Sequence, residues 1–156
     1  MRATVVTASN RAAAGTYDDT TGPIIVEALT ELGFDVHGPV VVPDGEPVAD
    51  AIREALDSGA RAVLTTGGTG LTPTDLTPEM TRPFLDREVP GIAEAIRAYG
   101  VAQGVPTAAL SRGLAGVSGK ALIVNLPGSR GGVKDGLAVV VPLLEHAVAQ
   151  IEGSDH

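Results

Sequence analysis

The 156-residue chain is long enough for one domain with its own core and leaves no room for a second. With 44% hydrophobic and 19% charged residues it is typical of soluble globular proteins, it has no cysteine for a disulfide or a thiolate metal site, and no apolar run approaches a membrane span. The net charge of −8 argues against nucleic acid as a partner, because binding to a polyanion depends on clustered Lys and Arg.

The first half of the chain alternates between predicted strands and helices. Residues 3–8 form an apolar run that predicts a strand, beginning almost at Met1 where a signal peptide would otherwise stand. "TGPIIVEALTELG" has apolar residues at helical spacing, with Thr21 placed to cap the helix and Gly33 placed to end it. A less regular strand is predicted at 34–42, and "PVADAIREALDSG" predicts a helix that ends at Gly59. We expect a cytoplasmic protein.

The second half continues the alternation. A strand is predicted at 60–66, two helices separated near Pro90 at 77–100, and a further strand at 121–126. A helical stripe then runs from Val133 to Ile151, and Pro142 within it predicts a break or kink near Val141. This order predicts a single-domain three-layer α/β/α sandwich with a mainly parallel sheet over residues 1–152, with 153–156 as a frayed tail.

The charges are distributed unevenly. Residues 1–79 hold twelve acids and four bases, whereas residues 80–156 hold seven of each. Between Glu94 and Asp135 there is no acid, so this segment could accept a small anion, although five scattered surface bases are an equally good explanation. The three histidines are not at ligand spacing, which argues against a zinc site. The histidines are His37, His146 and His156, and the bases are Arg97, Arg112, Lys120, Arg130 and Lys134.

Two glycine-rich loops follow predicted strands. Residues 67–70 read Gly-Gly-Thr-Gly after "AVLTT", and "LPGSRGG" follows "ALIVN". Ligands of open α/β sheets bind at the carboxyl ends of the strands, and glycine lets backbone N–H groups converge on an anion. Neither loop matches a P-loop or the complete dinucleotide fingerprint. The pair suggests a phosphate site, with ordinary strand-end turns as the alternative.

Two aspartates follow strands near these loops. Asp75 lies five residues beyond Gly70, where it could hold Mg²⁺ beside bound phosphates, or simply stabilise a turn. "LTPE" after it reads as an N-cap at Thr77. Asp44 follows the second strand and could reach the same edge, although "PDG" alone favours a turn.

Several motifs in a fixed order resemble one family. "TTGGTGLTPTDLTPE", "REVPGIAEAIR" and "LIVNLPGS", together with "ASNRAAAGTYDDTTGP" and "PDGEPV", resemble the Mog/MoaB family of molybdenum cofactor biosynthesis proteins. The similarity runs from about residue 2 to about residue 150. Active members are molybdopterin adenylyltransferases, a class of nucleotidyltransferase. The resemblance therefore implies transfer of AMP from Mg-ATP, the co-substrate, to the terminal phosphate of molybdopterin, with release of pyrophosphate.

The resemblance also implies the site residues and the partners. Asp44 and Asp75 match the two acids that the family needs for adenylyl transfer, so both are expected to be catalytic and to hold Mg²⁺. It further implies a homotrimer, and the molybdotransferase of the next step as a partner. The residues expected to bind substrate are Ser9, Arg11, Thr66, Gly67, Gly68, Thr69, Gly70, Asn125, Leu126, Pro127, Gly128 and Ser129.

The chain departs from the family pattern at two positions. Asn10 stands where the family usually has an acid, and Arg130 replaces a proline that follows "NLPGS" in many relatives. Aromatic residues are scarce, so Tyr17 is the nearest candidate to stack on a pterin ring. A non-catalytic molybdopterin-binding paralogue therefore stays open as an alternative, as does a nucleotide-binding regulator that does not use the pterin.

Overall fold

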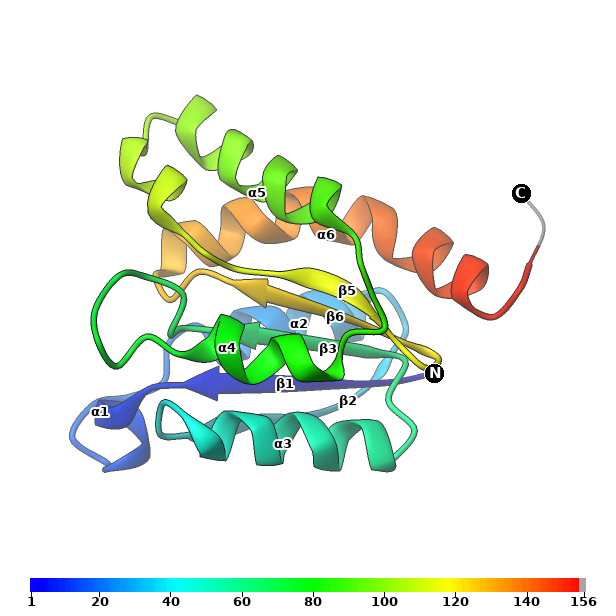
Figure 1. Ribbon diagram of the computed structural model, residues 1–156, viewed down its shortest axis with the longest axis horizontal. Helices are drawn as coiled ribbons and strands as arrows, with labels where there is room; N and C mark the ends of the chain where they lie inside the picture. Colours follow the sequence, from blue (N-terminus) through cyan, green and yellow to red (C-terminus); the bar gives the residue numbers. More distant parts are fainter. Residues whose placement is uncertain (155–156) are drawn as a thin grey trace.

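The computed structural model describes residues 1–154, so His156 and the last part of the predicted tail lie outside the described residues. Its centre is a six-stranded sheet in the order β2-β1-β3-β6-β5-β4 (Figure 1). Four strands are parallel: β1 (Arg2–Ala8), β2 (Asp35–Val42), β3 (Ala62–Thr66) and β6 (Ala121–Leu126). β5 (Ala115–Ser118) runs antiparallel to β6, and the two-residue β4 (Arg87–Glu88) forms the edge. The mainly parallel sheet is confirmed, and β4 and β5 were not predicted.

Helices cover both faces of this sheet, which confirms the three-layer sandwich (Figure 1). α2 (Gly22–Glu31), α5 (Pro90–Ala102) and α6 (Arg130–Ile151) pack on one face, where Ile25 and Ile96 join the same buried cluster as Leu64. α3 (Glu46–Asp57) packs on the other, where Ile52 meets Val63, and Met80 of α4 (Thr77–Thr81) lies beside them. The shorter elements are α1 (Asn10–Ala13), η1 (Arg82–Phe84) and η2 (Pro106–Leu110).

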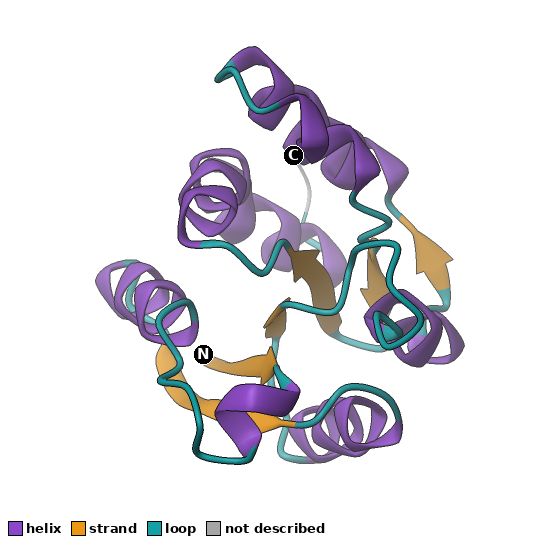
Figure 2. Cartoon of the chain, turned by 90° about the vertical axis from the view of Figure 1, so that its left-hand side faces the viewer, coloured by secondary structure: helices purple, strands orange, loops and turns teal. Residues whose placement is uncertain are grey.

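Strand register brings four loops to one end of the sheet. Ala8 pairs with Val42, Thr7 with Thr66, and Thr66 with Leu126, so β1, β2, β3 and β6 all finish at the same level. Figure 2 views the molecule from this end, where the teal loops gather around the strand tips. After β1 the chain passes to β2 on one side of it and then to β3 on the other side, so the strand order reverses at β1. Ligands of open α/β sheets bind at such a reversal.

One predicted helix detail is right in position only and one is wrong. Thr21 is the N-cap residue of α2, as predicted. Its side chain makes no capping bond, however, and the Asp19 carboxylate accepts the Thr21 and Gly22 N–H groups at 3.1 and 3.0 Å in its place. α6 runs through Pro142 without a break. Pro142 has no N–H to donate to the Ala138 carbonyl. Ala138 and Pro142 both lie on the exposed side of α6, where water can hydrogen-bond to that carbonyl.

Packing on both sides of Pro142 holds α6 together. Val140 and Leu144, which flank the proline, are buried against the sheet. Burial of two such side chains is worth about 3–6 kcal/mol, enough to offset the roughly 3 kcal/mol cost of a proline in a helix interior. At 22 residues α6 is the longest helix, yet no helix within residues 1–154 is long and apolar enough to cross a membrane.

Candidate functional site

Two hollows open at the carboxyl end of the parallel strands and share part of their walls. The first encloses about 350 Å³ between the ends of β1, β2 and β3, and the second about 390 Å³ between β3, β6, α5 and η2. Gly68, Asp75 and Gly128 line both. A larger hollow of about 470 Å³ lies at the opposite end of β1 and β2, away from both glycine loops.

The first, which we call the acidic hollow, is lined by four aspartates and one arginine: Asp18, Asp19, Asp44, Asp75 and Arg11. Asp19 is already occupied, because it caps α2 and accepts a hydrogen bond from the Thr7 hydroxyl at 2.9 Å. Asp44 differs, since its Oδ1 atom is buried and has no hydrogen-bond partner among the described residues. Burial, reinforced by the nearby Asp75 carboxylate, raises the pKa of Asp44.

The Gly68 backbone lies directly against this unpaired oxygen. A Cβ on Gly68 would be 2.9 Å from Asp44 Oδ1 and would also collide with the Thr77 hydroxyl. Thr77 was predicted as an N-cap, but it lies inside α4 and makes no capping bond. Its Oγ1 is the other buried polar side-chain atom without a hydrogen-bond partner in the described chain. A bare carboxylate oxygen and a bare hydroxyl therefore meet at a glycine, which fits a cation together with the anion that it accompanies.

Asp44 and Asp75 reach the acidic hollow from different loops. The Asp44 N–H donates to Asn10 Oδ1 at 2.9 Å, so Asn10 fixes the "PDG" turn to the start of α1. Ser9 caps α1 through its Oγ, which accepts from the Ala12 N–H at 3.2 Å. On the other side, Asp75 Oδ2 accepts from the Thr72 N–H at 3.0 Å within its own loop. The two predicted acids are thus brought together, along with Ser9 and Arg11.

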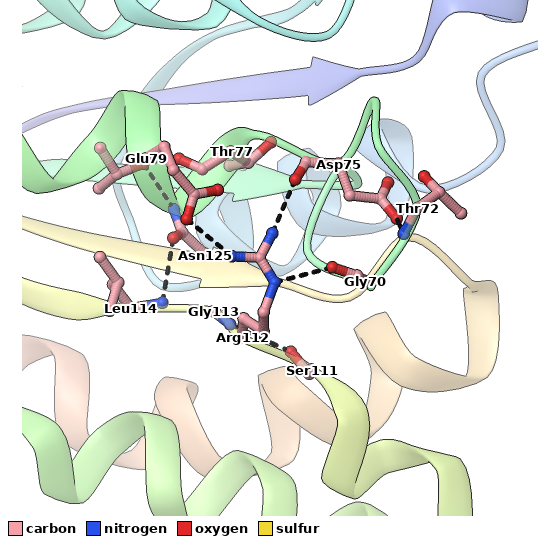
Figure 3. Close-up of polar contacts among 11 residues, drawn as sticks. Gly70, Thr72, Asp75, Thr77, Glu79, Ser111, Arg112, Gly113, Leu114 and Asn125 are labelled. Atoms are coloured by element: carbon pink, nitrogen blue, oxygen red, sulfur yellow. Dashed lines mark hydrogen bonds and ion pairs between the residues drawn. The ribbon is translucent and has the colours of Figure 1, made fainter.

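The loop that carries Asp75 is held by Arg112 (Figure 3). Its guanidinium donates to the carbonyls of Gly70 and Asp75 at 2.9 and 2.7 Å, and to Glu79 Oε2 at 2.7 Å. The hydrogen bond from Arg112 lowers the pKa of Glu79. Asp75 therefore keeps its carboxylate free of any ion pair with this arginine.

The second, which we call the apolar hollow, has a different lining. Ile96, Val105 and Leu110 supply apolar surface from α5 and η2, and Arg97 and Asp135 supply charge. Arg97 donates to the carbonyls of Ser111 and Gly113 at 3.3 and 3.1 Å. Asp135 is partly exposed, and its side chain makes no hydrogen bond or ion pair within residues 1–154. The remaining predicted residues on these walls are Thr66, Gly67, Thr69, Gly70, Pro127, Gly128 and Ser129.

Two predicted substrate-binding residues lie under the site instead of on its walls. Leu126 is fully buried in the core. Asn125 is 4% exposed and donates to Thr65 Oγ1 and Thr81 Oγ1 at 2.9 and 3.1 Å, while its Oδ1 accepts from the Leu114 N–H at 3.0 Å (Figure 3). In place of the predicted substrate contact, the Asn125 side chain on β6 thus joins β3, α4 and the residue that precedes β5 beneath the loops.

The basic segment does not form a single anion site. Of its five bases only Arg97 lines a hollow at this end, and Arg112 hydrogen-bonds to the Asp75 loop without lining either hollow. Lys120 lies at the far end of the sheet in the β5–β6 turn, and Arg130 and Lys134 are exposed on α6 without lining either hollow. Most of these bases therefore lie at scattered surface positions, which was the alternative that the sequence left open.

Three functional candidates escaped the sequence reasoning. The sequence showed that Asn10 replaces an acid and so lacks a negative charge. Its hydrogen bond to the Asp44 N–H has no signal in the sequence. Thr77 looked like a cap because "LTPE" has the usual spacing. Asp135 did carry a signal, since it is the first acid after Glu94 and follows the "NLPGS" loop by six residues.

Comparison with known proteins agrees with this arrangement. Residues 4–146 match the family described as "Probable molybdopterin binding domain". The chain is 39% identical over 151 residues to the molybdopterin adenylyltransferase of Pyrococcus furiosus, covering 92% of this chain and 89% of that protein. The structure of the molybdopterin biosynthesis Mog protein from Mycobacterium ulcerans superposes with a TM-score of 0.92 at 50% identity, covering 96% of this chain and 98% of that one.

Longer relatives contain the same domain. The chain is 40% identical over 156 residues to the molybdenum cofactor biosynthesis bifunctional protein of Synechococcus elongatus, covering 99% of this chain and 48% of that protein. The chain thus spans about half the length of that relative. The matched fold, the order of the motifs and the identity over almost the whole chain show that this protein belongs to the Mog/MoaB family of molybdopterin-binding domains.

Proposed function

We propose that this protein is a molybdopterin adenylyltransferase that transfers AMP from Mg-ATP to the terminal phosphate of molybdopterin and releases pyrophosphate. The observation that carries the proposal is the wall shared by the two hollows, made of Gly68, Asp75 and Gly128. A nucleotide in one hollow and a pterin in the other would bring their phosphates together at this wall. Holding two reactants in this way removes much of the entropic cost of their reaction.

The acidic hollow suits a metal-bound nucleotide. Asp44 and Asp75 would hold Mg²⁺, which binds proteins through one or two carboxylates and completes its shell with phosphate oxygens and water. Within residues 1–154 no group of three or more His, Cys, Asp or Glu could hold a metal ion, so the proposed site requires phosphate oxygens of the nucleotide as further ligands. When bound, the ion would neutralise the charge of the leaving pyrophosphate.

The apolar hollow suits the pterin. Its apolar residues would cover the ring faces, and a small number of polar groups would fix the orientation, as in most small-molecule sites. A pterin has an amino group and a ring N–H side by side, and the unpaired Asp135 carboxylate could accept hydrogen bonds from both. Tyr17 remains a candidate for stacking only at the acidic hollow, since it lines that one and is 61% exposed.

The reaction needs little chemistry from side chains. An oxygen of the molybdopterin terminal phosphate would bond to the α-phosphorus of ATP, while the bond from that phosphorus to the oxygen bridging to the β-phosphorus breaks. Because the attacking phosphate is already largely ionised at neutral pH, no strong general base is required. The Gly68 backbone would orient the phosphates, and Asp44 and Asp75 would fix the cation beside them.

The non-catalytic alternative rested on Asn10, which replaces an acid. Asn10 still supplies the oxygen that accepts from the Asp44 N–H at 2.9 Å, so the turn is held as an aspartate would hold it. What Asn10 lacks is one negative charge, and both candidate metal ligands are retained. This observation favours catalysis over simple binding.

Incubation with molybdopterin, ATP and Mg²⁺ tests the proposal. Pyrophosphate should appear only when molybdopterin is present, with one adenylylated product per pyrophosphate. No release above the rate without molybdopterin would leave binding as the function. A homotrimer, a cytoplasmic location and hand-over to a molybdotransferase remain parts of the same proposal, and gel filtration of the protein with and without that enzyme tests the first and the last.

A further inference from the structure

We propose that Arg112 is a positioning residue that fixes Asp75 as a metal ligand by clamping the loop of residues 69–76 to the strand leading into β5. This inference rests on the proposed function, because it assigns Asp75 to the metal. It concerns a residue that touches neither hollow, so it acts through the loop and not on the substrate.

Arg112 holds the loop at both of its ends. Its backbone N–H donates to the Thr69 carbonyl at 2.8 Å. Its Nε donates to the Gly70 carbonyl at 2.9 Å and its Nη2 to the Asp75 carbonyl at 2.7 Å (Figure 3). Three bonds from one residue therefore fix the entry and the exit of the loop. The distance between its ends cannot change unless at least one of them breaks.

Outside its own base, this loop has few hydrogen bonds to the rest of the described chain. Within residues 1–154, every hydrogen bond that ties residues 69–76 to the chain outside residues 68–80 comes from Arg112. The bonds among Thr72, Thr74 and Asp75 are internal, and the tip at 71–74 is exposed. Burial of apolar side chains cannot hold the tip, because Leu71 is 64% exposed. The Thr77 N–H also donates to the Gly68 carbonyl at 3.0 Å and closes the base of the loop, and the Thr72 N–H holds Asp75 Oδ2 from within it. Arg112 is therefore the residue that fixes this closed loop, and with it the Asp75 carboxylate, relative to the rest of the sheet.

The chemistry of arginine suits this role. Its planar fork presents donors at fixed angles and reaches two carbonyls and a carboxylate at once, which the single ammonium of lysine cannot do. The bonds go to the carbonyl of Asp75 and leave its carboxylate available for a cation. The ion pair with Glu79 contributes less, because both side chains are more than one third exposed and such pairs are worth about 0–1 kcal/mol.

The test compares Arg112→Lys with Glu79→Gln, which removes the ion pair and keeps the bonds to the two loop carbonyls. For each protein we would measure Mn²⁺ binding in the presence of ATP by electron paramagnetic resonance, molybdopterin affinity without nucleotide, pyrophosphate release and thermal unfolding. Loss of a residue that orients a metal ligand typically weakens metal binding by about 10–100-fold. Arg112→Lys should weaken Mn²⁺ binding by roughly this factor and leave molybdopterin affinity within about twofold.

The outcomes separate positioning from stability. Glu79→Gln should bind Mn²⁺ like the unaltered protein. The inference is overturned if Arg112→Lys binds Mn²⁺ normally. It is also overturned if Mn²⁺ binding and molybdopterin binding both fall by the same factor as the fraction of folded protein. Should the unaltered protein bind Mn²⁺ with ATP and release no pyrophosphate, adenylyl transfer fails as the function, whereas the effect of Arg112 on metal binding is still decided.

Discussion

Replacing Gly68 by alanine tests whether the glycine cradle is needed for its open space. Gly68 has φ of +68°, a left-handed conformation that costs a residue with a Cβ about 1–2 kcal/mol. The new methyl group would also lie 2.9 Å from Asp44 Oδ1 and overlap the Thr77 hydroxyl. Such overpacking adds about 1–3 kcal/mol.

Gly59→Ala provides the matched control. Gly59 has φ of +86°, and a Cβ there would meet nothing within 4 Å. This variant carries the backbone strain without the collision, so its free energy of unfolding should fall by about 1–2 kcal/mol only. Urea denaturation of the two variants should therefore differ by about 1–3 kcal/mol, the cost of crowding at Gly68.

Function should separate the pair more sharply than stability does. Gly68→Ala fills the space beside the unpaired Asp44 oxygen, so it should lose pyrophosphate release and Mn²⁺-ATP binding, whereas Gly59→Ala should retain both when assayed well below its melting temperature. If Gly68→Ala were no less stable than Gly59→Ala and turned over normally, the cradle would not be where the phosphates and the metal meet.

Three further changes test other parts of the site. Asp75→Asn should abolish adenylyl transfer without lowering the melting temperature by more than a few degrees, because this loop contributes little to the core; an equal loss of stability and activity would favour a turn-only role. Asp44→Asn should also stop transfer, yet raise stability at neutral pH. Since the pKa of Asp44 is raised in the folded protein, its ionisation opposes folding as the pH rises above the ordinary value of 3.8. The gain in the free energy of unfolding should be fully present above the raised pKa and should disappear toward pH 3.8. A difference between the two proteins in urea denaturation that stays constant or runs the opposite way across this range would contradict the reasoning. Asp135→Asn should weaken molybdopterin binding about 5–30-fold, the equivalent of one charge-assisted pair at about 1–2 kcal/mol, with ATP-dependent Mn²⁺ binding unchanged; unaltered molybdopterin affinity would remove Asp135 from the pterin site.

The parts of the fold that depend on local pattern could be predicted from the sequence. β1, β3 and β6 are mainly apolar runs, and α2 and α3 are each followed two residues later by Gly33 and Gly59, which have positive φ as helix-terminating glycines do. The antiparallel edge escaped because β4 has two residues and β5 is a short "AGVS" without an apolar run. Pro142 misled because packing against the sheet, which decides whether the helix continues, is not visible in local sequence.

The site was predictable in its loops and less so in its details. The glycine loops and the two acids follow strand ends, and parallel register brings such loops together. Asn125 looked like a pocket residue because it begins the "NLPGS" motif, although its side chain points beneath the loops into a buried network. Arg112 could be seen as a charge but not as a clamp, since its partners lie 33 to 43 positions away along the chain and only the fold brings them together.

Diffraction from crystals grown with Mn²⁺ and a non-hydrolysable ATP analogue examines the proposed metal site most directly. The account predicts one anomalous peak at about 2.1 Å from carboxylate oxygens of both Asp44 and Asp75, with the phosphates against the Gly67–Gly70 backbone. A manganese peak in the apolar hollow or at the far end of the sheet, or a nucleotide bound with neither acid in contact with its metal, would contradict it.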